Sequence, residues 1–302
     1  MAINVVQRLS HFMDYNRLFY MNITYECNNQ CIFCISHNTK NRTRYIENPF
    51  GIIKSVNNEY KFSKDDIFIV NGGEPTTSTY FENILDYLLA TEINIVVYTN
   101  GRTLSKYLKY THNSKIRWII AFYGLYELHD KYTGRKGSFL ETFNSLQSVP
   151  EINRSNFSIK FLLEDESQIE QFKELSEKLT DYNEIHISLL LNDNISKRFE
   201  LAKYVSPLIS ELLKKHIIKI SNLPLCSLDS DVKIDLENLT TQNINEYYFI
   251  GEKENVKRID YDRNHKWLVR CDSCKLHDIC CDNYKKYRAL KIYKYKISLE
   301  EE

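Results

Sequence analysis

Eight cysteines are the residues of this sequence best suited to carry chemistry, and they are clustered. Cys27, Cys31 and Cys34 form a C-x3-C-x2-C arrangement near the start. The others lie in the last third of the chain: Cys226 alone, then Cys271, Cys274, Cys280 and Cys281. In a reducing compartment, clustered cysteines indicate metal binding or catalysis rather than disulfides. Three thiolates this close together can hold three corners of a cubane [4Fe–4S] cluster.

The first group has no fourth cysteine nearby, and this absence is informative. A structural metal site is closed by its protein ligands, whereas a catalytic site keeps one coordination position open. The alternative is a zinc site that takes His37 as its fourth ligand. The spacing C-x3-C-x2-C is not a common one for zinc, so an open iron–sulfur cluster is the preferred interpretation.

The elements that must position these cysteines follow a strand–helix alternation. Short apolar runs predict strands at residues 18–23, 66–70, 93–98, 116–122, 156–163 and 184–190. Apolar residues three and four apart predict helices at residues 80–89, 139–146, 169–179 and 201–213. Six strand–helix alternations predict an α/β fold with a parallel sheet. Six are too few to close an eight-stranded barrel. We therefore expect a partial (β/α)6 TIM-type barrel, with the first cysteine group between its first two strands.

These features resemble the radical S-adenosylmethionine (SAM) superfamily, whose hallmark is C-x3-C-x2-C after the first strand of a partial barrel. Phe33, the aromatic residue before Cys34, also fits that pattern. The resemblance implies that the methionine moiety of SAM binds the open iron. An electron from a flavodoxin- or ferredoxin-type donor then cleaves SAM to methionine and a 5′-deoxyadenosyl radical. The cofactor supplies the radical chemistry, and the protein orients it.

Two further motifs follow the second and third predicted strands. In VNGGEPTT, Gly72 and Gly73 permit close backbone approach to a ligand, and Glu74 adds a charge. The resemblance implies that this GGE element binds the methionine ammonium group. In YTNGR, Thr99 and Asn100 are expected near the SAM ribose or methionine, although an ordinary Asn-Gly turn is the alternative.

The fourth strand leads into a segment that resembles the HD-x2-TG-x2-GSF pattern of peptide-modifying radical SAM enzymes. Tyr123 and Gly124 are expected to line the pocket for SAM. His129 and Asp130 are expected to build the loop, and Ser138 to cap the next helix. The pattern favours a peptide substrate.

The cysteines near the end resemble the twitch module, a shortened SPASM domain that follows the barrel in many family members. The resemblance implies one auxiliary [4Fe–4S] cluster, and hence two clusters per chain, with a structural zinc site as the alternative. Its ligands would be Cys226, Cys271, Cys274 and Cys280. Cys281 is a bystander, an alternative ligand or a hydrogen-atom donor to a substrate radical. The expected domains are therefore residues 1–215 for the barrel and 216–302 for the cluster domain.

Composition excludes some classes of function. Lys plus Arg and Asp plus Glu number 40 each, so the chain lacks the excess of basic residues that is typical of nucleic-acid-binding proteins. No apolar run is long enough to span a bilayer, and the start lacks a signal peptide, which predicts a cytoplasmic protein without a membrane partner.

The expected function is a radical SAM enzyme that matures a ribosomally made peptide by oxidative cross-linking or epimerisation. A dehydrogenase or epimerase of an aminoglycoside-like small molecule is one alternative, and a degenerate, non-catalytic binding subunit is another. Only 26 residues precede Cys27, fewer than the ~80 of a peptide-recognition domain. A peptide substrate is therefore expected to need a separate recognition protein or direct capture in the cleft.

Overall fold

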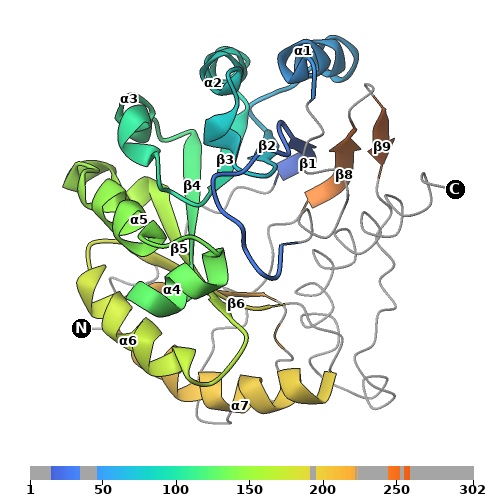
Figure 1. Cartoon of the computed structure of the whole chain (residues 1–302). Coiled ribbons are helices and arrows are strands. Elements are labelled where there is room, and N and C mark those ends of the chain that lie inside the picture. The colour runs from blue at the N-terminus through green and yellow to red at the C-terminus, as the bar shows by residue number, and fades with distance from the viewer. Residues whose placement is uncertain are drawn as a thin grey trace, which may run out of the picture.

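One nine-stranded sheet organises the chain (Figure 1), in the order β7-β6-β5-β4-β3-β2-β1-β8-β9. The computed structural model describes residues 15–34, 46–190, 195–221, 223, 244–251 and 255–258. The strands are β1 (Tyr15–Asn22), β2 (Asp66–Asn71), β3 (Asn94–Thr99), β4 (Ile116–Phe122), β5 (Phe157–Leu163), β6 (Glu184–Leu189), β7 (Ile217–Ser221), β8 (Ile244–Ile250) and β9 (Val256–Arg258). Every neighbouring pair is parallel except β8 and β9.

Helices connect these strands and form an arc along one face of the sheet (Figure 1). They are α1 (Pro49–Tyr60), α2 (Phe81–Ala90), α3 (Leu108–Thr111), α4 (Tyr126–Thr133), α5 (Ser138–Gln147), α6 (Gln168–Lys178) and α7 (Ile195–Leu212), with short 3₁₀ turns at Pro75–Thr77, Leu104–Tyr107 and Glu151–Asn156. Parallel strands need such crossovers, because a hairpin can join only antiparallel ones. In the described part of the chain, no helix has the length and apolar character needed to cross a membrane.

The six predicted strands are confirmed as β1 to β6, and four predicted helices as α2, α5, α6 and α7. The sheet is open, as expected for a partial barrel, because β7 and β9 are its edges among the described residues. The strand-like stretches after residue 216 join the same sheet: β7 pairs with β6, and β8 pairs with β1. The division into domains at residue 215 stays a prediction.

Large aromatic side chains fill the space between the sheet and its helices. The ring of Phe161 in β5 stacks on that of Phe172 in α6 at 4.4 Å. Trp118 in β4 packs edge-on against Phe81 in α2, at 6.3 Å between ring centroids. All four are fully buried, and each such side chain contributes roughly 1.5–3 kcal/mol relative to exposure. This packing fixes the positions of the strands. Because β1, β2, β3 and β4 are parallel, the loops that follow them all lie at the carboxyl ends of the strands. We call these ends of the strands, with their loops, the carboxyl rim.

Candidate active site

The three clustered cysteines lie in an irregular segment at the carboxyl rim, directly after β1. We call residues 24–34 the cysteine loop. Cys27 is exposed and Cys31 and Cys34 are half-buried, and all three are free thiols. Within the loop, the Cys34 amide donates to the Cys31 carbonyl at 3.1 Å, and the Asn29 amide to Cys27 Sγ at 3.4 Å.

The donor set of this loop fits an iron–sulfur cluster better than a closed metal site. Three cysteine thiols within one short loop are the kind of ligand set that iron–sulfur clusters take. Across the ranges that the structure covers, no three His, Cys, Asp or Glu side chains form a ready metal-binding group. Although Cys27 is exposed as a residue, protein atoms around its thiol desolvate it and raise its pKa to about 11, while the charge of Arg102 acts in the opposite direction. Binding of a metal would therefore release a proton from Cys27.

The GGE turn after β2 is pressed against the backbone of the cysteine loop. The Gly73 amide donates to the Thr24 carbonyl at 2.8 Å, and the Glu74 amide to the Glu26 carbonyl at 2.7 Å. A Cβ atom on Gly72, whose φ is +148°, would lie 2.2 Å from the Thr24 oxygen, and one on Gly73 would lie 2.2 Å from the Glu26 oxygen. These glycines therefore allow the loop itself to come close. Their expected approach to SAM stays a prediction.

Glu74 joins the rim of β2 to the rim of β3. Its carboxylate is buried, with 1% of the residue exposed. It accepts hydrogen bonds from the hydroxyls of Thr76 (2.6 Å) and Thr99 (2.5 Å) and from the amides of Asn100 (2.7 Å) and Thr76 (3.2 Å). Burial raises the pKa of Glu74, against the opposite effect of these donors. A direct contact of Glu74, Thr99 or Asn100 with SAM stays a prediction.

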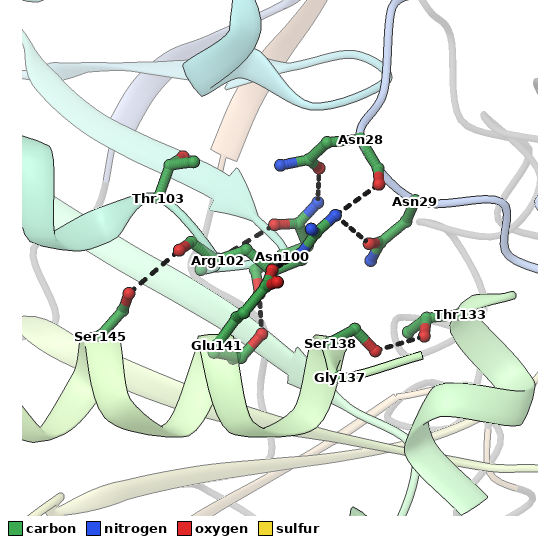
Figure 2. A network of polar contacts seen from close by, with 12 residues as sticks. Asn28, Asn29, Asn100, Arg102, Thr103, Thr133, Gly137, Ser138, Glu141 and Ser145 are labelled. Carbon is green, nitrogen blue, oxygen red and sulfur yellow. Dashed lines mark hydrogen bonds and ion pairs between the residues drawn. The ribbon is translucent and has the colours of Figure 1, made fainter. Parts of the chain in front are cut away.

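The turn after β3 holds the cysteine loop from a second side (Figure 2). The Asn100 side-chain amide donates to Asn28 Oδ1 at 2.6 Å. Arg102 Nη1 donates to the Asn28 carbonyl and, at 2.9 Å, to Asn29 Oδ1. Sequence reasoning missed Arg102, because one arginine after an Asn-Gly turn carries no motif of its own.

The segment after β4 holds the loop from a third side. The Gln30 amide donates to the Thr133 carbonyl at 2.7 Å, and the Ile32 amide to the Tyr132 carbonyl at 3.1 Å. A Cβ atom on Gly134, which ends α4 at a φ of +62°, would lie 2.4 Å from the Gln30 oxygen. Three turns from different strands thus hold the segment that carries the cysteines.

The prediction that Ser138 caps α5 is wrong. Ser138 is the first residue of the helix rather than its cap. Asp130 takes that role: its carboxylate accepts from the amides of Gly137 (2.5 Å) and Phe139 (2.9 Å) and from the Ser138 hydroxyl (2.9 Å). Burial alone would raise the pKa of Asp130, but the two amides outweigh it and the pKa is lowered. The expectation that Asp130 builds this loop agrees with these contacts.

Comparison with known proteins assigns the chain to a family. The family description "Radical SAM superfamily" matches residues 21–179, more than half of the chain. The chain belongs to the radical SAM superfamily. No curated protein matches its sequence.

Solved radical SAM structures share the fold at low sequence identity. SuiB of Streptococcus suis, solved with the precursor peptide SuiA, is 13% identical at a TM-score of 0.59, over 88% of this chain and 71% of SuiB. The anSMEcpe structure with bound AdoMet is 15% identical at a TM-score of 0.58, over 94% and 96%. A further anSMEcpe structure, with AdoMet and the Cp18Cys peptide, is 15% identical at 0.56, over 88% of both chains.

In this radical SAM chain, Tyr123 packs against an aromatic residue of the cysteine loop. Its ring lies 4.7 Å from that of Phe33, the residue before Cys34, and 6.2 Å from that of Tyr132. Burial raises the pKa of Tyr123 well above its usual value, and the nearby thiols add to the rise. Burial lowers the pKa of His129 to about 4, so its imidazole is neutral at pH 7 and its Nδ1 can accept from the Tyr123 amide at 3.4 Å.

The remaining predicted site residues lie outside the described residues. They are His37, Cys226, Cys271, Cys274, Cys280 and Cys281. The auxiliary cluster and the role of Cys281 therefore stay predictions.

Proposed function

We propose that this chain is a radical SAM enzyme that binds a [4Fe–4S] cluster through Cys27, Cys31 and Cys34. When bound, the cluster and SAM supply a 5′-deoxyadenosyl radical that abstracts a hydrogen atom from the substrate. One observation carries the proposal: the three free thiols share a loop that two rim turns hold by backbone hydrogen bonds and a third holds by side-chain hydrogen bonds. The backbone of the loop is fixed in this way, so that mainly the cysteine side chains would have to turn toward one another to bind a cluster.

The rim residues would orient SAM and favour its charge. The Glu74 carboxylate accepts hydrogen bonds only from uncharged groups among the described residues. A cation that arrives at the rim would favour the ionised form of this acid. The ammonium and sulfonium of SAM are such cations. In the proposal, Gly72, Gly73, Thr99 and Asn100 shape the surface beside them, and Tyr123 lines the pocket.

We propose a ribosomally made peptide as the substrate. Two kinds of support agree: the HD-x2-TG-x2-GSF segment, and structural neighbours that were solved with bound peptides. The electron would come from an external flavodoxin- or ferredoxin-type donor, and peptide delivery would use a separate recognition protein or direct capture. An aminoglycoside-like small molecule is the competing substrate.

The proposal includes a second [4Fe–4S] cluster on Cys226, Cys271, Cys274 and Cys280. Such a cluster would accept the electron that an oxidised product leaves behind. Cys281, as a hydrogen-atom donor, would instead give an epimer. We favour oxidation, because four candidate ligands support the cluster and a single thiol supports the donor.

Iron content and SAM cleavage test the proposal together. After anaerobic reconstitution we expect about eight iron atoms per chain, since each cubane holds about four, and about half as many when the first three cysteines are replaced by alanine. The dithionite-reduced protein should release 5′-deoxyadenosine from SAM, and Cys34→Ala should abolish the release. Arg154→Gln, which breaks an ion pair with Asp181, is the control and should retain it. Cleavage that survives in Cys34→Ala would refute the site, and stoichiometric zinc would refute the second cluster.

A further inference from the structure

Arg102 connects the cysteine loop to a helix that carries no cysteine (Figure 2). Its side chain is buried, at 7% exposure. Nη1 contacts Asn28 and Asn29 of the loop, while Nε donates to Glu141 Oε2 on α5 at 2.5 Å. One planar guanidinium thus spans two segments that lie more than a hundred residues apart in the sequence.

The turn that carries Arg102 is itself fixed to α5. The Thr142 hydroxyl donates to the Asn100 carbonyl at 2.9 Å, and the Ser145 hydroxyl to the Arg102 carbonyl at 3.0 Å. The Arg102 amide also donates to Asn100 Oδ1 at 3.1 Å. With its backbone held in this way, Arg102 reaches the loop from a rigid base.

The contacts fall on the part of the motif where order matters most. Asn28 and Asn29 lie between Cys27 and Cys31, the longer of the two spacings. The Asn28 carbonyl has no hydrogen-bond donor within the cysteine loop itself, and Arg102 Nη1 supplies one. Glu141 is half-exposed, whereas the Arg102 side chain that pairs with it is buried. The other side-chain hydrogen bonds of Arg102 go to Asn28 and Asn29 of the cysteine loop, so we expect its loss to act first on the shape of that loop.

We propose that Arg102 is a positioning residue for the cluster, which holds the Cys27–Cys31 segment in its binding shape before any iron is present. Glu141 is the brace that orients the guanidinium. The inference rests on the proposed function, because it assumes that these cysteines bind a cluster. It goes beyond it by assigning a role to a residue outside the cysteine motif.

Hydrogen exchange in the cluster-free protein tests this role without any activity assay. The amides of Gln30 and Ile32, which donate to carbonyls of α4, report on the order of the loop. In Arg102→Gln we expect them to exchange at least tenfold faster than in the wild type. Glu141→Gln should give a smaller increase, because the loop contacts of Arg102 remain.

Arg154→Gln is a matched control. Arg154 is also a buried arginine, at 13% exposure, paired at 2.5 Å with a half-exposed carboxylate, that of Asp181. Its loss should leave exchange at Gln30 and Ile32 unchanged. Equal acceleration in both variants would mean general destabilisation and would overturn the proposal, as would exchange in Arg102→Gln within twofold of the wild type.

Arg102→Lys separates geometry from charge. A lysine ammonium carries its donors on one atom and lacks the rigid fork by which Nε reaches Glu141 while Nη1 reaches Asn28 and Asn29, so the loop should remain fast-exchanging although the charge is kept. After reconstitution, both Arg102 variants should also bind iron more slowly than Arg154→Gln. Full rescue by lysine would refute positioning by the planar group. Failure of the proposed function would show differently, as a wild-type protein whose three cysteines take up no iron.

Discussion

Two buried glutamates at opposite ends of the sheet have opposite surroundings. Glu184 begins β6 at the amino end, where Lys219 lies at 2.8 Å, Arg117 at 4.0 Å and the Ser158 hydroxyl donates to it. Glu74 follows β2 at the carboxyl rim, and its hydrogen-bond donors there are uncharged. Burial acts on both acids, yet the pKa of Glu184 is lowered by its cations while the pKa of Glu74 is raised.

Under the proposed function, the difference separates an end of the strands that stabilises the fold from an end that binds SAM. At the amino end, cations of the protein itself neutralise the acid. At the rim, the described residues supply hydrogen bonds but no countercharge to Glu74, so an incoming cation can supply it. Ligand sites of barrel folds gather at the carboxyl ends of the strands, and the electrostatics of this chain agree with that division.

The largest expected effect tests how strongly SAM cleavage depends on the close backbone contact between Gly134 and the cysteine loop. Gly134 and Gly137 both have left-handed backbones, with φ of +62° and +83°. A Cβ atom on Gly134 would lie 2.4 Å from the Gln30 oxygen, whereas one on Gly137 would meet nothing within 4 Å. Relief of that clash must change the distance between the cysteine loop and the turn at Gly134 by about 1 Å, a displacement that can cost about 100-fold in rate if the loop is what moves. We expect Gly134→Ala to lower SAM cleavage by about that factor.

Gly137→Ala is the control, because it adds only backbone strain of roughly 1–2 kcal/mol. It should lower the melting temperature and leave SAM cleavage close to the wild type. Similar losses of cleavage in the two variants would mean that strain, and not contact with the loop, explains Gly134.

The sequence predicted the fold of this chain better than its contacts. Strand and helix positions depend on local runs and periods, and those were readable at β1 to β6. Which turn meets which loop depends on the path of the chain in space. Gly72 and Gly73 were singled out for close approach to a ligand, which stays a prediction, and the structure shows them close to the cysteine loop.

Side chains with long-range partners were the hardest to predict. Arg102 contacts residues more than seventy positions earlier in the chain, so no local pattern marks it. Asp130 caps α5 from seven to nine residues before the groups that it binds, beyond the reach of the usual capping pattern. The prediction that Ser138 caps α5 was wrong because the residue that caps the helix lies outside the local sequence pattern.

A smaller effect sharpens the comparison between the two acids. Glu184→Gln leaves two cations without their carboxylate, and we expect a loss of about 1–3 kcal/mol in unfolding free energy at pH 7. Because its folded pKa is lowered, the stabilisation by Glu184 is complete above the ordinary value of 4.5 and is lost as the pH falls through the folded pKa. The gap between wild type and variant should therefore close in acid.

Glu74→Gln should show the opposite trend with pH. The folded pKa of Glu74 is raised, so the wild type loses stability as the pH rises above 4.5 through that pKa. The variant lacks this titration, and its stability relative to the wild type should improve over the same window. Urea unfolding of the cluster-free proteins from about pH 2 to pH 8 measures both trends, since the Glu184 window lies below pH 4.5 and the Glu74 window above it. Parallel trends in the two variants would contradict the division between the ends of the sheet.

The smallest effect concerns the cap of α5 by Asp130, in the segment after β4 that holds the cysteine loop. Asp130→Ala removes the acceptor of two amide hydrogen bonds at the start of α5, and we expect a loss of about 1–2 kcal/mol at pH 7. Ser138→Ala removes one hydroxyl and should cost about 0.5–1.5 kcal/mol, less than the change at Asp130. Since the folded pKa of Asp130 is lowered, its contribution should fade as the pH drops below the ordinary value of 3.8. Urea unfolding at pH 7 and pH 3 decides the matter: a larger loss in Ser138→Ala would return the cap to the residue that the sequence pattern named.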